Sequence, residues 1–282
     1  MVRIVSVLLV GLVAASTASI FIKLCDAPAL IISAYRLLFA SLILAPFALR
    51  RRIWKNWDRS EAGWLILSGA LLSLHFAFWI GSLKFTSVAS SVVLVNTHPI
   101  FVGLGSWLFL RERPGTPLIL GIGLSVIGSG IIGFGDLSLS GDALLGDGMA
   151  LLGAVAVAGY FIVGRRMRKD KDLLSYVFPV YTAAGLILVP MALLRGDSFF
   201  GYTQTSYLLL LLLALIPQLI GHSAFNWALK YIPASLVAIT ILAEPAASTL
   251  LAYFILGEGL DFWKALGGAL IFSGILIALR KR

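Results

Sequence analysis

Long apolar runs, separated by short clusters of charged and turn-forming residues, are the dominant pattern along this chain. A helix needs about 20 apolar residues to cross the hydrocarbon core of a bilayer. The runs have about this length, so the pattern predicts an all-α integral membrane protein with ten spanning helices. The expected helices are 4–23, 29–49, 62–83, 87–110, 116–135, 146–165, 174–194, 206–229, 233–256 and 262–279.

Three polar interruptions organise the chain. The segment "RRRIWKNWDRSE" occupies residues 50–61, and "RRMRKDKD" occupies residues 165–172. The segment "GDLSLSGDALLGDG" at 135–148 is expected to be a linker between two five-helix halves, 6–135 and 146–280. The first apolar run resembles a signal peptide, but its length and the nine runs after it favour a first spanning helix.

The composition agrees with a membrane location. The chain has 282 residues, of which 60% are hydrophobic and 12% are charged, whereas soluble domains carry about 25% charged residues. A net charge of +9 would indicate nucleic-acid binding in a soluble protein, but here the basic residues lie between apolar runs. Cys25 is the single cysteine, which excludes an internal disulfide and a cysteine-based metal site.

The distribution of basic residues predicts the orientation. If the N-terminus is cytoplasmic, 17 Lys and Arg residues lie on the cytoplasmic side and 4 on the other, with Arg36 inside a helix. Cytoplasmic loops of membrane proteins carry the excess of Lys and Arg. We therefore expect a multi-pass protein of the cell inner (cytoplasmic) membrane with both termini in the cytoplasm.

The sequence contains an internal repeat with an offset of 146 residues. The stretch "NTHPIFVGLGSWLFLRE" at 96–112 matches "LAEPAASTLLAYFILGE" at 242–258. Each half holds five helices, an odd number, so the second half must cross the membrane in the opposite orientation. Inverted repeats are typical of secondary transporters, whose substrate site lies near the midplane between the repeats.

Ionisable residues within the apolar runs are the first candidates for function. A carboxylate at the depth of Glu244 costs about 2.5–3.5 kcal/mol, so it must face a cavity or a partner, or be protonated. His98 occupies the matching position in the first half. Both are candidates for solute binding or proton coupling, and interhelical hydrogen bonding is the alternative. Arg36 is expected either to bind an anionic group or Glu244, or to snorkel to the outer headgroups.

Two prolines follow these residues at matching mid-helix positions, Pro99 and Pro245. Proline lacks the N–H and clashes with the preceding turn, which frees the carbonyl groups of Val95 and Ile241. Freed carbonyls within a membrane are tolerated where they line protein or water. We expect these prolines to be hinges beside a central cavity, and a static kink is the alternative.

Polar residues on neighbouring helices complete the candidate site. His222 and Asn226 lie four residues apart on one face of the eighth helix, with Gln218 one turn before. His75 and Trp79 have the same spacing on the third helix. The predicted substrate-binding residues are Glu244, His98, His222, Asn226, His75, Trp79 and Tyr160. Interhelical hydrogen bonding and packing are the alternative roles.

Further residues recur at the same offset. The pairs are Lys84 with Lys230, Glu112 with Glu258, Gly121 with Gly267, and Gly128 with Gly274. The charged residues of this set are expected at helix ends, where each forms an ion pair with another residue across a short loop. The glycines are expected to let the fifth and tenth helices pack closely. The same helices offer a surface for a homodimer, so monomer and homodimer both stay open.

Other classes of protein are less well supported. A phosphate-binding loop of the form G-x-x-x-x-G-K-[ST] is absent from the sequence, so ATP is not expected to drive the chain directly. Ser223 with His75 or His98 would be needed for an intramembrane hydrolase, a class that does not explain the repeat. A membrane scaffold without solute flux is a third alternative.

The two repeated stretches, each followed by a glycine-rich helix, resemble the two copies of the EamA domain in the drug/metabolite transporter superfamily. The resemblance covers about 6–135 and 146–280. It implies ten helices in inverted repeats, a central cavity formed largely by helices one, three, four, six, eight and nine, and often export of amino acids or related metabolites. The chain departs from the family pattern at Thr97-His98 and at Arg111, where a small or apolar residue and a glycine are usual.

The sequence therefore predicts a secondary transporter, not an enzyme, that exports small polar metabolites such as amino acids by alternating access. Its expected partners are a small-molecule substrate and the lipid bilayer, with proton coupling or passive exchange, and no cofactor. A multidrug or nucleotide-sugar carrier of the same fold is the alternative within transport.

Overall fold

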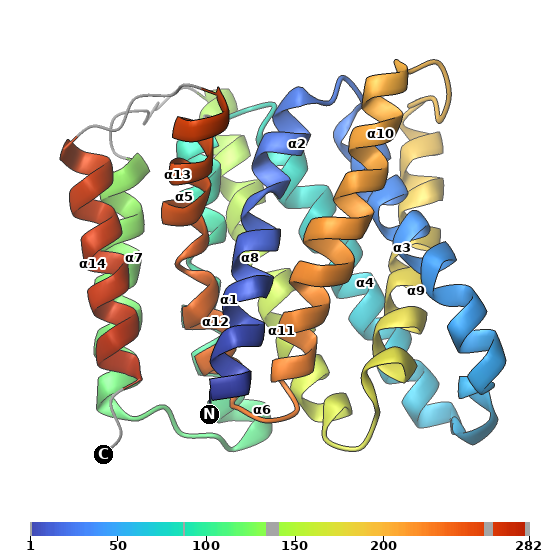
Figure 1. The fold of residues 1–282 in the computed structure, drawn as a ribbon, viewed down its shortest axis with the longest axis horizontal. Coiled ribbons are helices and arrows are strands. Elements are labelled where there is room, and N and C mark those ends of the chain that lie inside the picture. Colours follow the sequence, from blue (N-terminus) through green and yellow to red (C-terminus); the bar gives the residue numbers. More distant parts are fainter. Residues whose placement is uncertain (1, 87, 134–140, 257–261, 280–282) are drawn as a thin grey trace.

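The computed structural model describes residues 2–86, 88–133, 141–256 and 262–279, and this part of the chain is helical throughout apart from connections (Figure 1). The elements are α1 (Val2–Ser16), α2 (Ala18–Leu24), α3 (Ala29–Arg51), the 3-10 helix η1 (Ile53–Asn56), α4 (Arg59–Ser82), α5 (Val88–Val95), α6 (His98–Leu110), α7 (Thr116–Gly133), α8 (Gly141–Arg168), α9 (Leu173–Leu194), α10 (Gln204–Leu213), the π-helix η3 (Ala214–His222), α11 (Ser223–Ala228), α12 (Ala234–Ile241), α13 (Glu244–Leu256) and α14 (Phe262–Ala278).

The apolar runs of the sequence appear as membrane-length helices. Within the described residues, eight helical units are long and apolar enough to cross a bilayer, and two shorter apolar helices, Thr116–Ile131 and Ala265–Ala278, accompany them. Each expected run corresponds to one of these units. The prediction of an all-helical, multi-pass membrane protein is thus supported by the structure, and the start of α1 and the end of α14 lie at the same end of the bundle (Figure 1).

The predicted central linker is partly wrong. Helix α8 begins at Gly141, so residues 141–148 are helical, and the rest of the expected linker lies outside the described residues. This first part of α8 is held against the connection between α4 and α5. Thr86 Oγ1 donates a hydrogen bond of 2.7 Å to Asp147 Oδ1, and a Cβ at Gly146 would lie 2.7 Å from the backbone nitrogen of Thr86. Tertiary packing therefore extends the helix beyond the apolar run.

The fourth and ninth spans are both broken in the middle. The break falls at residues 96–97 between α5 and α6, and at residues 242–243 between α12 and α13. The two breaks are separated by the 146-residue offset of the sequence repeat. Pro99 and Pro245 each occupy the second position of the helix that follows, where a missing N–H costs no intrahelical hydrogen bond. The chain passes through both breaks in turns with i→i−3 hydrogen bonds, so the predicted kinks are local interruptions of the α-helical hydrogen bonding within one span.

The eighth span contains a π-helix that the sequence pattern does not reveal. Helix η3 lies between α10 and α11 and includes Pro217, Gln218 and His222. Short π-helical segments are rare and are frequently found at functional sites. Gln218 in this segment is buried and His222 is half-buried.

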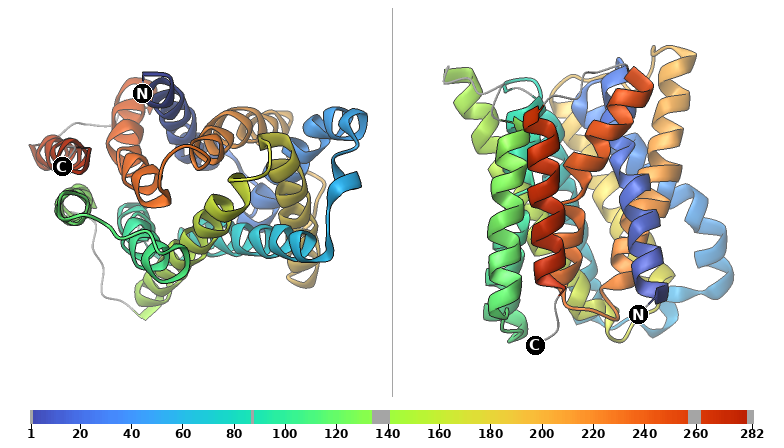
Figure 2. Two further views of the ribbon diagram at one scale, coloured as in Figure 1. Left: turned by 90° about the horizontal axis from the view of Figure 1, so that it is seen from below. Right: turned by 60° about the vertical axis from the view of Figure 1, so that its left-hand side comes forward.

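Helices α7 and α14 lie side by side at one edge of the bundle (Figures 1 and 2). A Cβ at Gly128 would lie 2.6 Å from the carbonyl oxygen of Gly267, and a Cβ at Gly274 would lie 2.5 Å from that of Gly121. Such close approach requires glycine. The predicted packing role of these glycines is confirmed, and both partners belong to the same chain.

Candidate functional site

The three histidines come from different spans and form one group. His75 lies on α4, His98 begins α6, and His222 ends η3. The ring of Phe76 lies between two of them, with its centroid 5.0 Å from that of His75 and 5.5 Å from that of His222. His98 is close enough to both to repel them when the rings are protonated. His75 and His98 are buried, and His222 is half-buried. The structure therefore brings together histidines that are up to 147 positions apart in the sequence.

Each buried histidine has one ring nitrogen fixed by a backbone carbonyl. His75 Nδ1 lies 3.0 Å from the oxygen of Gly153, and His98 Nδ1 lies 3.2 Å from the oxygen of Val95. Because a carbonyl oxygen only accepts hydrogen bonds, Nδ1 carries the proton in both rings and Nε2 is free to accept in the neutral form. The Val95 carbonyl is one of the two that the sequence expected a proline to free.

Trp79 and Tyr160 are placed by contacts with other members of the predicted set. The ring of Trp79 stacks on that of His75, with centroids 5.7 Å apart and an interplanar angle of 12°. The hydroxyl of Tyr160 accepts a hydrogen bond of 2.5 Å from Asn226 Nδ2. The same Asn226 amide donates a hydrogen bond of 2.8 Å to the oxygen of His222, one helical turn earlier.

Arg36 lies inside the bundle, which answers the question that the sequence left open. Its side chain is buried, with 1% of the residue exposed. Arg36 Nε donates a hydrogen bond of 2.7 Å to Gln218 Oε1, and the guanidinium lies 4.4 Å from the ring centroid of Phe76. Snorkelling to the headgroups is therefore wrong for this residue. The guanidinium of Arg36 is close enough to attract the carboxylate of Glu244 and to repel a protonated His222.

We call the following residues the central cluster: Arg36, His75, Trp79, His98, Tyr160, Gln218, His222, Asn226 and Glu244. Arg36 and Gln218 were not among the predicted substrate-binding residues. Arg36 was expected either to bind an anionic group or Glu244, or to snorkel, because an ionisable group within a membrane span is a functional candidate by default. Gln218 was placed on the same face as His222 by its spacing, but its bond to Arg36 was not predicted.

Several polar atoms of the central cluster are buried without a hydrogen-bond partner among the described residues. These atoms are Arg36 Nη1, Trp79 Nε1, His98 Nε2, Gln218 Nε2, His222 Nδ1 and Asn226 Oδ1. Buried polar groups in native proteins are nearly always paired with protein or water. The unpaired atoms of the central cluster lie together in one region, and a binding site for a polar solute requires such a group of free donors and acceptors.

Ser223 does not form the pair that a hydrolase would need. Its hydroxyl lies 3.2 Å from the hydroxyl of Tyr181 and donates a longer bond of 3.4 Å to the oxygen of Gln218. The described hydrogen bonds of Ser223 include no histidine. A serine nucleophile requires a base within hydrogen-bonding distance, and this arrangement does not provide one.

Arg165 of α8 links several helix ends at one end of the bundle. Arg165 Nε lies 3.0 Å from Glu112 Oε1, and Arg165 Nη1 donates a bond of 2.6 Å to the oxygen of Leu229. Glu112 was expected to pair across a short loop, which is wrong because α8 lies closer to it in space. Its counterpart Glu258 lies outside the described residues. These contacts join the ends of the fourth, sixth and eighth spans.

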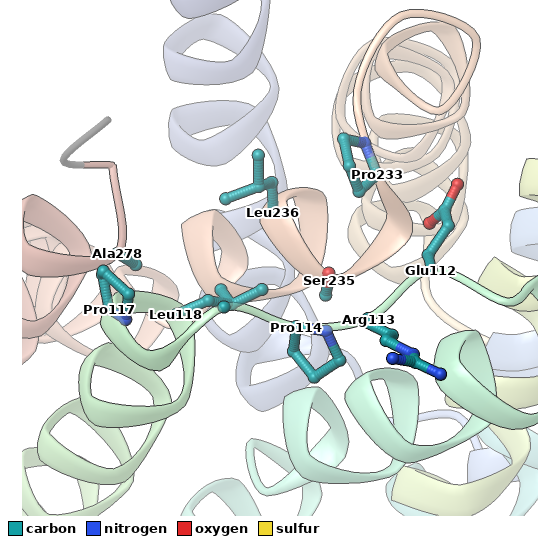
Figure 3. Close-up of a pocket in the computed structure, with 10 residues that line it drawn as sticks. Glu112, Arg113, Pro114, Pro117, Leu118, Pro233, Ser235, Leu236 and Ala278 are labelled. Carbon is teal, nitrogen blue, oxygen red and sulfur yellow. The ribbon is translucent and has the colours of Figure 1, made fainter. Parts of the chain in front are cut away.

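A cavity of about 340 Å³ lies at this same end, between the α6–α7 connection and the start of α12. Glu112 and Arg113 lie on one side of it, and Pro117 and Leu118 lie on the other (Figure 3). None of the predicted substrate-binding residues lines this cavity. It is therefore separate from the central cluster.

Comparison with known proteins agrees with this architecture. A solved structure described as "Crystal structure of protein" superimposes with a TM-score of 0.81 over 99% of this chain and 97% of its own, at 17% identity, which supports the fold alone. An uncharacterized transporter of Archaeoglobus fulgidus is 27% identical over 88% of this chain and 86% of its own length. The uncharacterized transporter YwfM of Bacillus subtilis is 27% identical over 89% of this chain and 84% of its own length.

The model of the EamA-like transporter family matches the chain twice, at residues 2–134 and 144–280. Together the two matches cover nearly all of the sequence, and they agree with the membrane-length helices described above. The chain therefore belongs to the EamA-like transporter family.

Proposed function

We propose that this protein is a secondary transporter that moves small polar organic solutes, such as amino acids, out of the cell by alternating access. The observation that carries the proposal is the central cluster, a group of buried and half-buried polar side chains that includes the residues at which the broken helices resume, His98 and Glu244. Buried polar residues in a membrane protein mark solute or ion pathways. Broken helices at the midplane are a common way to build such sites.

We infer that the two halves, 6–135 and 146–280, are inverted repeats. The matching helix breaks support this arrangement. The glycine contacts support it further, since Gly121 meets Gly274 while its counterpart Gly267 meets Gly128. Reciprocal contacts of this kind are typical of a two-fold relationship, which in inverted repeats has its axis in the membrane plane. Exchange of conformations between the halves would then open opposite sides in turn.

In this mechanism the residues of the central cluster bind the solute, and the breaks before Pro99 and Pro245 are the hinges. Glu244 is the candidate for binding a proton or a cationic group of the solute, because it is the acidic side chain of the central cluster and lies within a membrane-length helix. The Arg165–Glu112 ion pair closes the end that carries α1's N-terminus, which the basic residues predict to be cytoplasmic. Loosening of this end would admit solute from the cytoplasm.

The test is solute uptake by proteoliposomes that contain the purified protein. A labelled panel of amino acids, nucleosides, sugars and a cationic dye covers the classes of solute under consideration. Saturable flux of amino acids or similar small polar solutes is expected. Preferential flux of the dye would favour the multidrug alternative, and flux of nucleosides or sugars would favour the nucleotide-sugar type. Absence of saturable flux from folded protein would contradict transport of these solutes.

A further inference from the structure

The bundle contains two buried arginines with different environments. Arg168 is 2% exposed, and its guanidinium is satisfied by backbone carbonyls, through Nε to the oxygen of Asn226 at 3.0 Å and through Nη1 to that of Lys171. Arg36 is 1% exposed, but its Nη1 has no hydrogen-bond partner among the described residues. Arg168 is therefore a structural arginine, whereas Arg36 retains an unused donor.

The orientation of the Arg36 guanidinium is fixed by its neighbours. Its Nε is bonded to Gln218 Oε1, and its plane lies near the ring of Phe76. The Nη groups are consequently presented in a defined direction. An arginine fork held in this way matches the geometry of a carboxylate, which it binds through two parallel N–H···O bonds.

Gln218 supplies a further donor beside this fork. Arginine only donates hydrogen bonds, so the oxygen of the Gln218 amide must face Arg36 and its Nε2 must face elsewhere. That Nε2 is buried and makes no hydrogen bond of normal geometry among the described residues, and the hydroxyl of Tyr181 is the acceptor that it faces. Arg36 Nη1 and Gln218 Nε2 are thus two adjacent donors without a hydrogen bond of normal geometry, and donors favour an acceptor-rich, anionic group over a cationic one.

The helix ends in the central cluster also favour an anionic group over a cationic one. The 13-residue helices α6 and α13 begin at His98 and Glu244, both members of the central cluster. The N-terminus of a helix carries partial positive charge and stabilises anions. Glu244 interacts electrostatically with Arg36, yet the described ion pairs do not include a direct contact between them. The Nη1 donor is therefore not occupied by this carboxylate.

We propose that Arg36 and Gln218 form a subsite that binds the carboxylate group of the transported solute. This inference rests on the proposed transport function and narrows its substrates to carboxylates. The carboxylate can belong to an amino acid or to a simple organic acid. In the first case the solute amine would have Glu244 as its acidic partner, and in the second case no amine is needed.

The experiment uses three solutes that share one side chain. L-phenylalanine has both charged groups, L-phenylalaninamide lacks the carboxylate, and 3-phenylpropanoate lacks the amine. Their binding is measured on purified protein by thermal stabilisation, and their flux is measured in proteoliposomes. We expect phenylalaninamide to bind about ten- to a hundredfold more weakly than the better of the two carboxylates. A preference for phenylalanine over phenylpropanoate would identify amino acids, and the reverse would identify organic acids.

Variants at the two residues separate recognition from folding. Arg36→Gln should lose the preference for carboxylates, and Arg36→Lys should keep only part of it because the fork is lost. Gln218→Glu places a carboxylate of nearly identical size on the guanidinium, so the protein should fold while binding of both carboxylate solutes is lost. This variant keeps the test decisive if Arg36→Gln does not fold.

Two results would overturn the inference. One is a wild-type protein that binds the amide as well as the carboxylates, and the other is an unchanged carboxylate preference in folded Arg36→Lys and Gln218→Glu. Saturable flux of panel solutes without any preference for carboxylates would reject this subsite while the proposed transport function stands. Absence of both binding and flux for every solute would reject both.

Discussion

The hydroxyl of Ser125 donates a hydrogen bond of 3.1 Å to the carbonyl oxygen of Ile271, and these two residues are 146 positions apart in the sequence. This separation equals the offset between the two broken helices. It also equals the offset between glycines at equivalent positions of the repeat, such as Gly121 and Gly267. Equivalent positions of α7 and α14 therefore meet where the helices cross. The contact supports the proposal that the two halves are related by a local two-fold axis.

The close crossing of α7 and α14 should depend on individual glycines. Gly128→Ala places a Cβ 2.6 Å from the oxygen of Gly267 and 2.9 Å from the nitrogen of Ile271. Because backbone atoms cannot move aside without separating the helices, we expect a loss of about 1–3 kcal/mol in the free energy of unfolding. Titration with SDS in mixed micelles measures this change.

Gly130→Ala is the matched control on the same helix. A Cβ at Gly130 meets no atom within 4 Å, so the substitution should be neutral or stabilise the helix by up to about 1 kcal/mol. Equal destabilisation by both substitutions would contradict a specific role for the glycine at the crossing.

The fold is expected to be less stable with Arg111 than it would be with glycine, the usual residue at this position in the family pattern. Its φ angle is +57°, and it ends α6 in the left-handed conformation. This conformation is strained for a residue with a Cβ and is readily adopted by glycine. Arg111→Gly should therefore stabilise the fold by about 1 kcal/mol.

Arg113→Gly removes the same charge from the same connection without relieving a positive φ angle, so it is the control for this prediction. It should be neutral or mildly destabilising, since glycine raises the entropy of the unfolded chain. Unfolding measured under one set of conditions compares the two variants, and a destabilised Arg111→Gly protein would refute the argument.

The prolines that follow the helix breaks should affect transport more than stability. Pro99→Ala and Pro245→Ala restore an N–H, which permits the two helix segments to join into a continuous helix. If the breaks are hinges, the flux of whichever solute is transported should fall severalfold while the protein remains folded. Pro190→Ala, in α9 and outside the central cluster, is the control. Unchanged flux in both hinge variants would indicate static kinks.

The contact between Arg165 and Glu112 should hold one end of the bundle closed. Glu112→Gln removes the charge while keeping the shape of the side chain. A partly exposed ion pair contributes about 1 kcal/mol at most, so opening of this end should increase up to about fivefold. The measurement is the rate at which a maleimide modifies a reporter cysteine, Ser223→Cys, in a protein whose Cys25 is replaced by serine.

Glu61→Gln is the control for this measurement. It removes another ion pair with a residue near the end of α8, the 2.9 Å contact with Lys171, but it leaves the contacts of Arg165 unchanged. We expect a smaller effect on the modification rate. Faster modification in the Glu61 variant than in the Glu112 variant would contradict the assignment of the closure to Arg165.

The spans and their breaks could be predicted from the sequence because their causes are local. Apolar length defines a spanning helix, and prolines at matching positions of the repeat indicated the two breaks, although Pro46, Pro179 and Pro190 lie inside continuous helices. The glycine faces of α7 and α14 could be recognised for the same reason. The sequence also indicated that the polar residues would lie in one region of the bundle, because the repeat places His98 and Glu244 at equivalent depths.

Other features depend on tertiary contacts and could not be predicted. Gln218 lies in the π-helix and bonds Arg36, which is 182 positions away, and neither residue alone signals this pairing. Glu112 binds Arg165, which is 53 positions away, where the sequence favoured a nearby partner. Helix α8 starts before its apolar run because Gly146 and Asp147 pack against Thr86.

The central claim, that solute passes through the central cluster, is tested most directly by flux through Glu244→Gln. Uptake is measured in proteoliposomes with and without a pH gradient, and the exposed Asp170→Asn variant is the control for loss of one acidic charge. We predict saturable flux in the wild type and in Asp170→Asn. Glu244→Gln should lose either the response to the gradient, if Glu244 binds the proton, or all flux, if it binds solute. Equal flux and equal gradient response in all three proteins would contradict the account.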